Sequence, residues 1–209
     1  MCGITGLIHV NGSPVLPAIL KKMTDSIAHR GPDGEGHWIE GNVGIGHRRL
    51  AILDRSLAGH QPMISSDRRF VLSFNGEIYN FKELRKELQS SGVNTWSTNS
   101  DTEVILNLYI KWGLDGLKKL EGVFAVAIWD VEKKHLLLIR DRLGVKPLYY
   151  TILKSGFGFS SEISSLHKIP NFDDRVDEQS LSEYLWYGNT YGNRTFFSGA
   201  RQLEPGHYL

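Results

Sequence analysis

The chain opens, after Met1, with the stretch that decides the fold, Cys2-Gly3-Ile4-Thr5-Gly6-Leu7-Ile8-His9-Val10. Residues 3–10 form a short apolar run that ends at the turn sequence Asn11-Gly12-Ser13-Pro14, and this pattern predicts a buried strand. The single cysteine of the chain stands directly before that strand. A strand starting at residue 3 would hold the terminus rigidly, as a reacting group requires.

The position of Cys2 gives its backbone a chemical use. Initiator Met is normally removed when the next residue is small, and cysteine qualifies, so processing would leave Cys2 with a free α-amine. The amine has a reference pKa of about 7.7–8.0 and the thiol one of about 8.5, so one residue would supply a nucleophile and a matched base. The alternatives are a buried small hydrophobe or an exposed thiol without function.

Composition narrows the class of protein. The 209 residues are 41% hydrophobic and 22% charged, as in ordinary globular domains. The net charge of +1 gives no reason to expect a nucleic-acid or membrane partner, and no apolar run approaches the ~20 residues that span a bilayer. No signal peptide is visible. One cysteine permits no internal disulfide and no multi-cysteine metal site, which suits a cytoplasmic protein.

Hydrophobic periodicity predicts the remaining elements. A helix is expected over residues 16–27 and a last helix near residues 180–186. Capping boxes predict two more helices, which begin after Asn80 and after Ser100. Strands are expected at residues 43–53, 70–74, 123–129, 135–140, 148–152 and 156–160. Because helices and strands are largely segregated, the order indicates an α+β layered domain.

Two further expectations come from the aromatic residues and the end of the chain. Trp112, Trp129 and Trp186 fit core positions better than a binding surface. Residues 202–209 look like a turn that leads into a strand cut short. The 209 residues are therefore interpreted as part of a longer protein.

Eight segments carry a resemblance to a known family. They are Met1-Cys2-Gly3-Ile4-Thr5-Gly6, Arg30-Gly31-Pro32-Asp33-Gly34, Gly46-His47-Arg48-Arg49-Leu50, Gln61-Pro62-Met63, Asn75-Gly76-Glu77-Ile78-Tyr79-Asn80, Ser100-Asp101-Thr102-Glu103-Val104, Leu120-Glu121-Gly122-Val123-Phe124-Ala125 and Arg140-Asp141-Arg142-Leu143-Gly144. In this order and spacing the chain resembles the class II glutamine amidotransferases, which are N-terminal-nucleophile hydrolases. Within them it looks like the glutaminase domain of glutamine-hydrolysing asparagine synthetases. The resemblance implies one glutamine amidotransferase type 2 domain over residues 1–209, folded as a four-layer αββα sandwich with antiparallel sheets.

The resemblance implies that Cys2 attacks the side-chain amide of L-glutamine. Arg49 suits the α-carboxylate because a guanidinium offers a bidentate fork, although a solvent-exposed strand arginine is the alternative. On a strand, Arg48 and Arg49 point to opposite faces, and the family match places Arg49 in the pocket. Backbone groups of Leu50, Ala51, Ile52 and Leu53 are expected to line the same wall.

Four residues are expected to complete the pocket. Asp101 suits the α-ammonium, although an acid in the first turn of a helix is favourable by itself. Asn75 and Gly76 are expected to donate hydrogen bonds to the oxyanion; the alternative, a type I′ hairpin turn, fits less well because a capped helix follows. Glu77 resembles a further polar contact to the glutamine, with a surface acid as the alternative.

No metal or cofactor is expected for glutamine hydrolysis. In the resembled family the ammonia passes to a C-terminal synthetase domain of the same polypeptide, which uses ATP and Mg²⁺ to convert aspartate to asparagine. Some relatives amidate other carboxylates, so the acceptor is left open, and a homodimer is a possible assembly. The rival interpretations are an enzyme of the same fold acting on another amide, and a non-catalytic domain that keeps the fold.

Overall fold

The computed structural model describes residues 1–51 and 59–209 and contains two antiparallel sheets. Sheet A has the strand order β10-β8-β9-β1-β3-β2, and sheet B has the order β4-β5-β6-β7. The strands of sheet A are β1 (Gly3–His9), β2 (Gly34–Glu40), β3 (Val43–Arg49), β8 (Tyr149–Leu153), β9 (Gly156–Ser160) and β10 (Arg201–Gln202). Those of sheet B are β4 (Met63–Ile64), β5 (Phe70–Ile78), β6 (Gly122–Asp130) and β7 (His135–Arg140).

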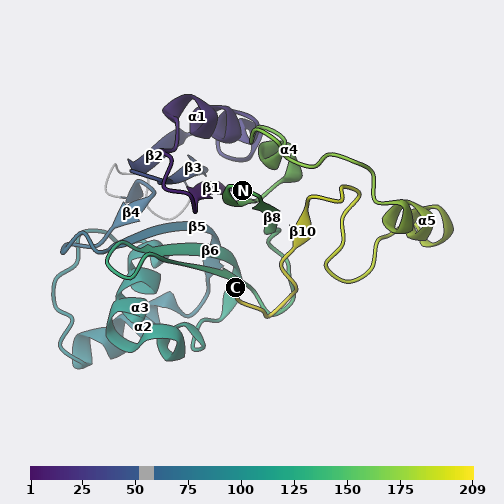
Figure 1. Cartoon of the computed structure of the whole chain (residues 1–209). Coiled ribbons are helices and arrows are strands. Elements are labelled where there is room, and N and C mark those ends of the chain that lie inside the picture. Colours follow the sequence, from purple (N-terminus) through teal and green to yellow (C-terminus); the bar gives the residue numbers. More distant parts are fainter. Residues whose placement is uncertain (52–58) are drawn as a thin grey trace.

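Helices cover the outer face of each sheet (Figure 1). Helices α1 (Pro17–Asp25) and α4 (Ile163–Leu166) pack on sheet A, and α2 (Phe81–Ser90) and α3 (Asp101–Leu117) pack on sheet B. A short 3₁₀ turn, η1 (Ala28–Arg30), follows α1. The layers therefore run helix, sheet, sheet, helix, which confirms the predicted αββα sandwich.

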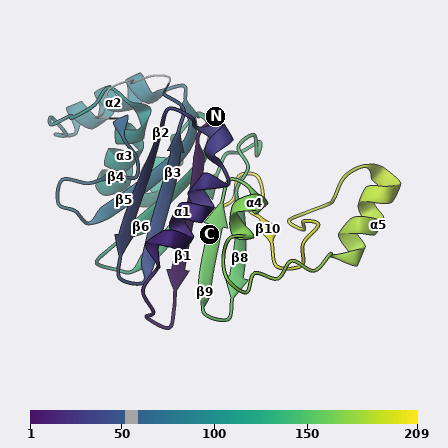
Figure 2. The same ribbon diagram turned by 90° about the horizontal axis from the view of Figure 1, so that it is seen from above.

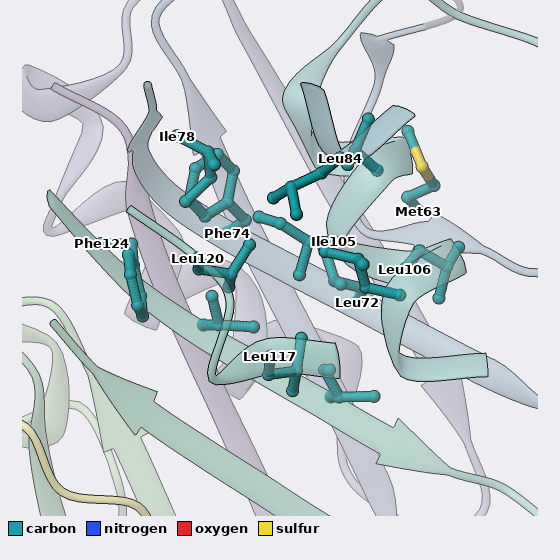
Figure 3. Packing of buried hydrophobic residues seen from close by; sticks show 14 of the residues in the cluster. Met63, Leu72, Phe74, Ile78, Leu84, Ile105, Leu106, Leu117, Leu120 and Phe124 are labelled. Atoms are coloured by element: carbon teal, nitrogen blue, oxygen red, sulfur yellow. The ribbon is translucent and has the colours of Figure 1, made fainter. Parts of the chain in front are cut away.

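The period-two alternation of each strand divides its side chains between two cores. On β5, Leu72, Phe74 and Ile78 pack against α2 and α3 (Figure 3), while Val71 and Ser73 face sheet A. His47 of β3 is fully buried between the sheets, where its Nδ1 lies 3.1 Å from Ser73 Oγ. This alternation decides which side chains reach the space between the sheets.

Several sequence predictions were wrong in detail. Strand β2 was missed because Gly34, Gly36 and two glutamates obscure its alternation. Strand β5 continues through Asn75 and Gly76 to Ile78, so the Asn-Gly pair lies inside a strand and is not a hairpin turn. The capping box at Asn80 does not form, because its side chain bonds Lys119 O and Glu121 N instead of its own helix.

The capping box at Ser100 does form, with Ser100 Oγ accepting from Glu103 N. The Glu103 carboxylate reaches further back than the motif predicts, to the N–H groups of Ser97 and Thr98. Asp101 is thereby held at the first position of α3. The predicted strand at 43–53 ends at Arg49, and residues 52 and 53 lie outside the described part of the chain.

Residues 176–197 form an arm that carries α5 (Glu178–Tyr187) and stands away from the layered body (Figures 1 and 2). Trp186 on this arm is 81% exposed, so its predicted core position was wrong. The helix fits the predicted position, but its apolar side chains find no core to enter. Among the described residues, no helix is long and apolar enough to cross a membrane.

The α3 core supplies a test of the layer packing. Ile105 is fully buried between α3 and sheet B, whereas Ile110 on the same helix is 45% exposed. We expect Ile105→Ala to lower the free energy of unfolding by about 2–5 kcal/mol, and the matched control Ile110→Ala to change it by about 0.5 kcal/mol or less. Urea unfolding followed by circular dichroism measures both. Equal losses would contradict the assignment of α3 faces.

Candidate active site

The backbone at the N-terminus is fixed by hydrogen bonds to Ser161 and Arg30. Ile4 N–H donates to Ser161 Oγ at 3.0 Å, and Ser161 N–H donates to Ile4 O at 2.9 Å. Arg30, whose side chain is buried, donates from Nε to Cys2 O at 2.9 Å and forms an ion pair with Glu162 at 2.9 Å. Cys2 is therefore an ordered residue directly before the first residue of β1.

The thiol of Cys2 sits against the backbone of Leu50. Leu50 N–H donates to Cys2 Sγ at 3.3 Å, and the thiol lies 3.6 Å from Leu50 O. Burial raises the pKa of the Cys2 thiol above its ordinary value; the hydrogen bond from Leu50 and the charges of the N-terminus and Arg49 oppose this shift. The thiol is therefore neutral near pH 7, and a nearby base must remove its proton before it attacks.

A cavity of about 110 Å³ opens beside Cys2, between the ends of the two sheets. It is lined by Met1, Cys2, Arg49, Leu50, Gly59, Gln61, Phe74, Asn75, Gly76, Glu77, Ser100, Asp101, Thr102 and Lys146. The structure thus brings together Cys2, Arg49, Leu50, Asn75, Gly76, Glu77 and Asp101 from the predicted set. Ala51 uses its N–H on the Asp33 carboxylate at 2.9 Å, and Ile52 and Leu53 lie outside the described residues.

The two neighbouring arginines of β3 take opposite directions. Arg48 bonds Thr24 O at 3.1 Å and forms ion pairs with Asp25 and with Glu35 on the outer side of sheet A. Arg49 shares the inner face with Ile45 and His47, and it lines the cavity. The predicted division between the two residues follows from strand alternation.

The edge of β5 supplies backbone donors to the cavity. N–H groups two residues apart on a strand point to the same edge. Phe74 N–H donates to Gln61 Oε1 at 2.6 Å, and Ile78 N–H donates to Asp101 Oδ2 at 3.1 Å, both on the edge away from β6. Gly76 lies midway, so its N–H faces the cavity.

Gly76 is required by its packing against β6. A Cβ at this position would lie 2.2 Å from Val123 O and 2.7 Å from Phe124 Cα, which are backbone atoms that cannot yield. The absence of a side chain at Gly76 lets β5 pack closely against β6.

Asn75 carries a buried carboxamide whose polar atoms have no hydrogen-bond partner among the described residues. The residue is 1% exposed, and neither Nδ2 nor Oδ1 makes a hydrogen bond within the described part of the chain. Its side chain projects from the same face of β5 as Ser73, toward sheet A and the cavity. An unpaired buried amide costs about 1–3 kcal/mol, so the residue is arranged for a bond that a bound molecule would complete.

Asp101, at the start of α3, places a carboxylate in the cavity beside β5. It is 5% exposed, and burial raises its pKa to about 6, against the hydrogen bonds from Ile78 and from its own helix start; the charge of Glu77 adds to the rise. Glu77 itself is exposed at the cavity rim. The cavity thus holds two acids and Arg49, which are charges complementary to the two charged ends of an amino acid.

Four residues at the site were not predicted from the sequence. Arg30 holds the Cys2 backbone, Gln61 and Thr102 line the cavity, and Lys146 donates from Nζ to Met1 Sδ at 3.2 Å. Arg30, Gln61 and Thr102 had one sequence signal, their membership of segments shared with the resembled family, whereas Lys146 lies outside those segments. Within the described residues, no group of three or more His, Cys, Asp or Glu side chains converges as a metal site would need.

The fold and the sequence both match known proteins. A family model described as a glutamine amidotransferase domain matches residues 1–209. Asparagine synthetase [glutamine-hydrolyzing] 3 of Bacillus subtilis is 40% identical over all of this chain and 34% of its own length. Amidase chry2 of Gibberella zeae is 35% identical, with 100% of this chain and 32% of that protein covered. The chain spans about a third of the length of the curated relatives it matches.

A solved structure shares the fold. The glutamine phosphoribosylpyrophosphate amidotransferase from B. subtilis superposes with a TM-score of 0.71 at 22% identity, covering all of this chain and 46% of that one. At this identity the likeness speaks for the N-terminal-nucleophile sandwich and for nothing finer.

The raised pKa of Asp101 predicts a pH-dependent stability. The carboxyl ionises near pH 3.9 when unfolded and near pH 6 when folded, so its unfavourable contribution grows as the pH rises through this window. We expect Asp101→Asn to be more stable than the wild type by about 3 kcal/mol at pH 8, and the difference to vanish below about pH 3. Urea unfolding at several pH values measures it, with the exposed Asp115→Asn as control. A difference that does not vary with pH would contradict the burial effect.

Proposed function

This chain belongs to the glutamine amidotransferase domain family, and on that premise we propose that Cys2 is the nucleophile that hydrolyses L-glutamine to L-glutamate and ammonia. The observation that carries the proposal is the buried carboxamide of Asn75, which has no hydrogen-bond partner in the described part of the chain and lies beside the Gly76 N–H in the same cavity as the Cys2 thiol. Two donors facing one nucleophile are what a developing oxyanion requires.

The reaction begins once Met1 is removed. While Met1 is attached, the nitrogen of Cys2 is an amide and has no basic lone pair, and the Met1 side chain lines the cavity. After removal, the α-amine of Cys2 takes the thiol proton, directly or through a water. The thiolate attacks the amide carbon, and Asn75 and Gly76 stabilise the oxyanion.

The second half of the reaction restores the thiol. The protonated α-amine gives its proton to the leaving nitrogen, so ammonia departs and a thioester on Cys2 is left. Water then hydrolyses the thioester and releases L-glutamate. No metal or cofactor enters these steps.

The charged ends of L-glutamine bind on opposite walls of the cavity. Arg49 receives the α-carboxylate, and the neighbouring Leu50 lines the cavity beside it. Asp101 receives the α-ammonium, and Glu77 adds a second negative charge at the rim. This pairing favours a free amino acid over another amide substrate, and the intact nucleophile and donor pair argue against a non-catalytic domain.

The ammonia is used elsewhere in a longer polypeptide. We propose a parent protein in which a C-terminal synthetase domain, holding ATP and Mg²⁺, amidates aspartate to asparagine in the cytoplasm. Support comes from the asparagine synthetases among the relatives, about two thirds of whose length lies outside the match. Amidation of another carboxylate is the alternative.

The exposed apolar side chains of the arm around α5 are evidence for a large partner domain within the same polypeptide. Its exposed apolar side chains are Val176, Leu181, Tyr184, Leu185, Trp186, Tyr187, Tyr191 and Phe196. The arm is ordered by its own contacts, including the Asp177 N-cap and the Arg194–Glu183 ion pair. A preformed apolar surface of this kind is normally covered. We propose that the synthetase domain covers it; a second copy of the chain, forming a homodimer, is the alternative.

The first test is glutamate release from L-glutamine by the chain after mass spectrometry has verified the loss of Met1. We expect turnover by the processed chain and none by Cys2→Ala, because the nucleophile is gone. A matched chain that keeps one glycine before Cys2 lacks the free amine and should also be inactive. Full turnover by either variant would overturn the mechanism.

The second test compares the accessibility of Trp186 in this chain and in the full-length protein by hydroxyl-radical footprinting. We expect strong protection of Trp186 in the full-length protein, and no protection of Ile152, which is 78% exposed on the body of the domain. Protection that appears in the 209-residue chain as its concentration rises would favour the homodimer instead. Equal accessibility in both proteins would reject the proposed docking surface.

A further inference from the structure

Gln61 lies where sheet B leaves the edge of β5 open. Strand β4 pairs with β5 at Leu72 and Val71, and within residues 1–51 and 59–209 no strand pairs with β5 on that side at Phe74 and beyond. The Gln61 carboxamide takes that place, because its Oε1 accepts the Phe74 N–H at 2.6 Å. A side chain thus continues the ladder for one position.

The other end of the same carboxamide reaches α3. Gln61 Nε2 donates to Thr102 Oγ1 at 3.3 Å, and Thr102 follows Asp101. Asp101 in turn accepts the Ile78 N–H of β5 at 3.1 Å. These bonds close a ring that joins β5 to the start of α3 on both sides of the Gly76 N–H.

The position of Gln61 is fixed by its surroundings. The residue is 5% exposed, and Thr102 is 4% exposed. Its backbone packs so tightly on β2 that a Cβ on Gly36 would lie 1.9 Å from Gln61 O. Gln61 cannot shift without moving either β2 or the edge of β5.

We propose that Gln61 is a positioning residue that sets the spacing between the oxyanion donors, Asn75 and Gly76, and the ammonium anchor, Asp101. This inference rests on the function proposed above. L-glutamine has two methylenes between its α-carbon and its amide carbon, whereas L-asparagine has one. A clamp that fixes the two binding points at one separation therefore selects side-chain length.

The clamp explains how a small pocket could discriminate by one methylene. A yielding hydrophobic pocket distinguishes one methylene by only about 10–200-fold, and a displacement of about 1 Å can cost about 100-fold in rate. Holding Asp101 and the β5 edge in register turns a missing methylene into a failure to engage both ends. Gln61 touches neither end of the substrate in this account and acts through its neighbours.

Gln61→Met tests the inference, because it keeps the volume and removes both hydrogen bonds. The readout is the ratio of competitive inhibition constants for L-glutamate and L-aspartate, which differ by one methylene, measured on the processed chain. We expect the preference for L-glutamate to fall by about tenfold or more, together with a drop in kcat. Gln179→Met, at an exposed position, is the matched control and should leave the ratio unchanged.

Two further variants keep the test decisive if Gln61→Met is poorly folded. Gln61→Glu retains acceptors for Phe74 N–H and for the Thr102 hydroxyl, so it should restore most of the selectivity. Thr102→Val breaks the link to α3 alone and should lose selectivity as Gln61→Met does. A purely structural role would lower the unfolding midpoint and leave the ratio unchanged.

The outcomes separate the two proposals. If the wild-type chain hydrolyses L-glutamine but folded Gln61 and Thr102 variants keep its selectivity, the positioning role is wrong. If the processed wild-type chain neither hydrolyses nor binds L-glutamine, the proposed function itself fails.

Discussion

The hydrogen bonds that fix the backbone of Cys2 and Ile4 are the constraint on which the rest of the site depends. A chain terminus ordinarily frays, and a frayed nucleophile cannot be aimed. Here Ser161 holds Ile4 through two hydrogen bonds. Arg30 donates a hydrogen bond to Cys2 O, and Glu162 neutralises the charge of Arg30. Strand β1 lies between β3 and β9 and is one of the two central strands of sheet A, so the terminus is carried by an interior strand.

The second constraint is the alternation of strands. Arg49 of β3 and Asn75 of β5 lie on the inner faces of their strands and line the same cavity as Cys2. Arg48, one residue before Arg49, therefore points to the outer face. The backbone of β5 alternates in the same way, so its open edge presents the Gly76 N–H between two N–H groups already bonded to Gln61 and Asp101. The ends of the two sheets and the start of α3 thus bring Arg49, Asn75 and Asp101 to the cavity.

The sequence predicts much of this because its signals are local. Strand β1, the first turn of α3 and the opposite directions of Arg48 and Arg49 follow from periodicity and capping. It does not predict β2, whose glycines hide the alternation, or the use of Asn80 to bond a distant loop. Gln61 and Arg30 act on residues 13 and 28 positions away, a relation that only the tertiary structure displays. The prediction that Trp186 lies in the core was wrong for a different reason, because its side chain is exposed on the arm that carries α5.

The proposed mechanism requires the thiol of the N-terminal Cys2 to carry a glutamyl thioester during turnover. Rapid acid quenching of the processed chain with L-glutamine, followed by peptide mass spectrometry, tests it directly. We expect a glutamyl group on the N-terminal peptide that begins with Cys2. This group should disappear when the substrate is exhausted. Turnover with no adduct on Cys2, or an adduct on another residue, would contradict it.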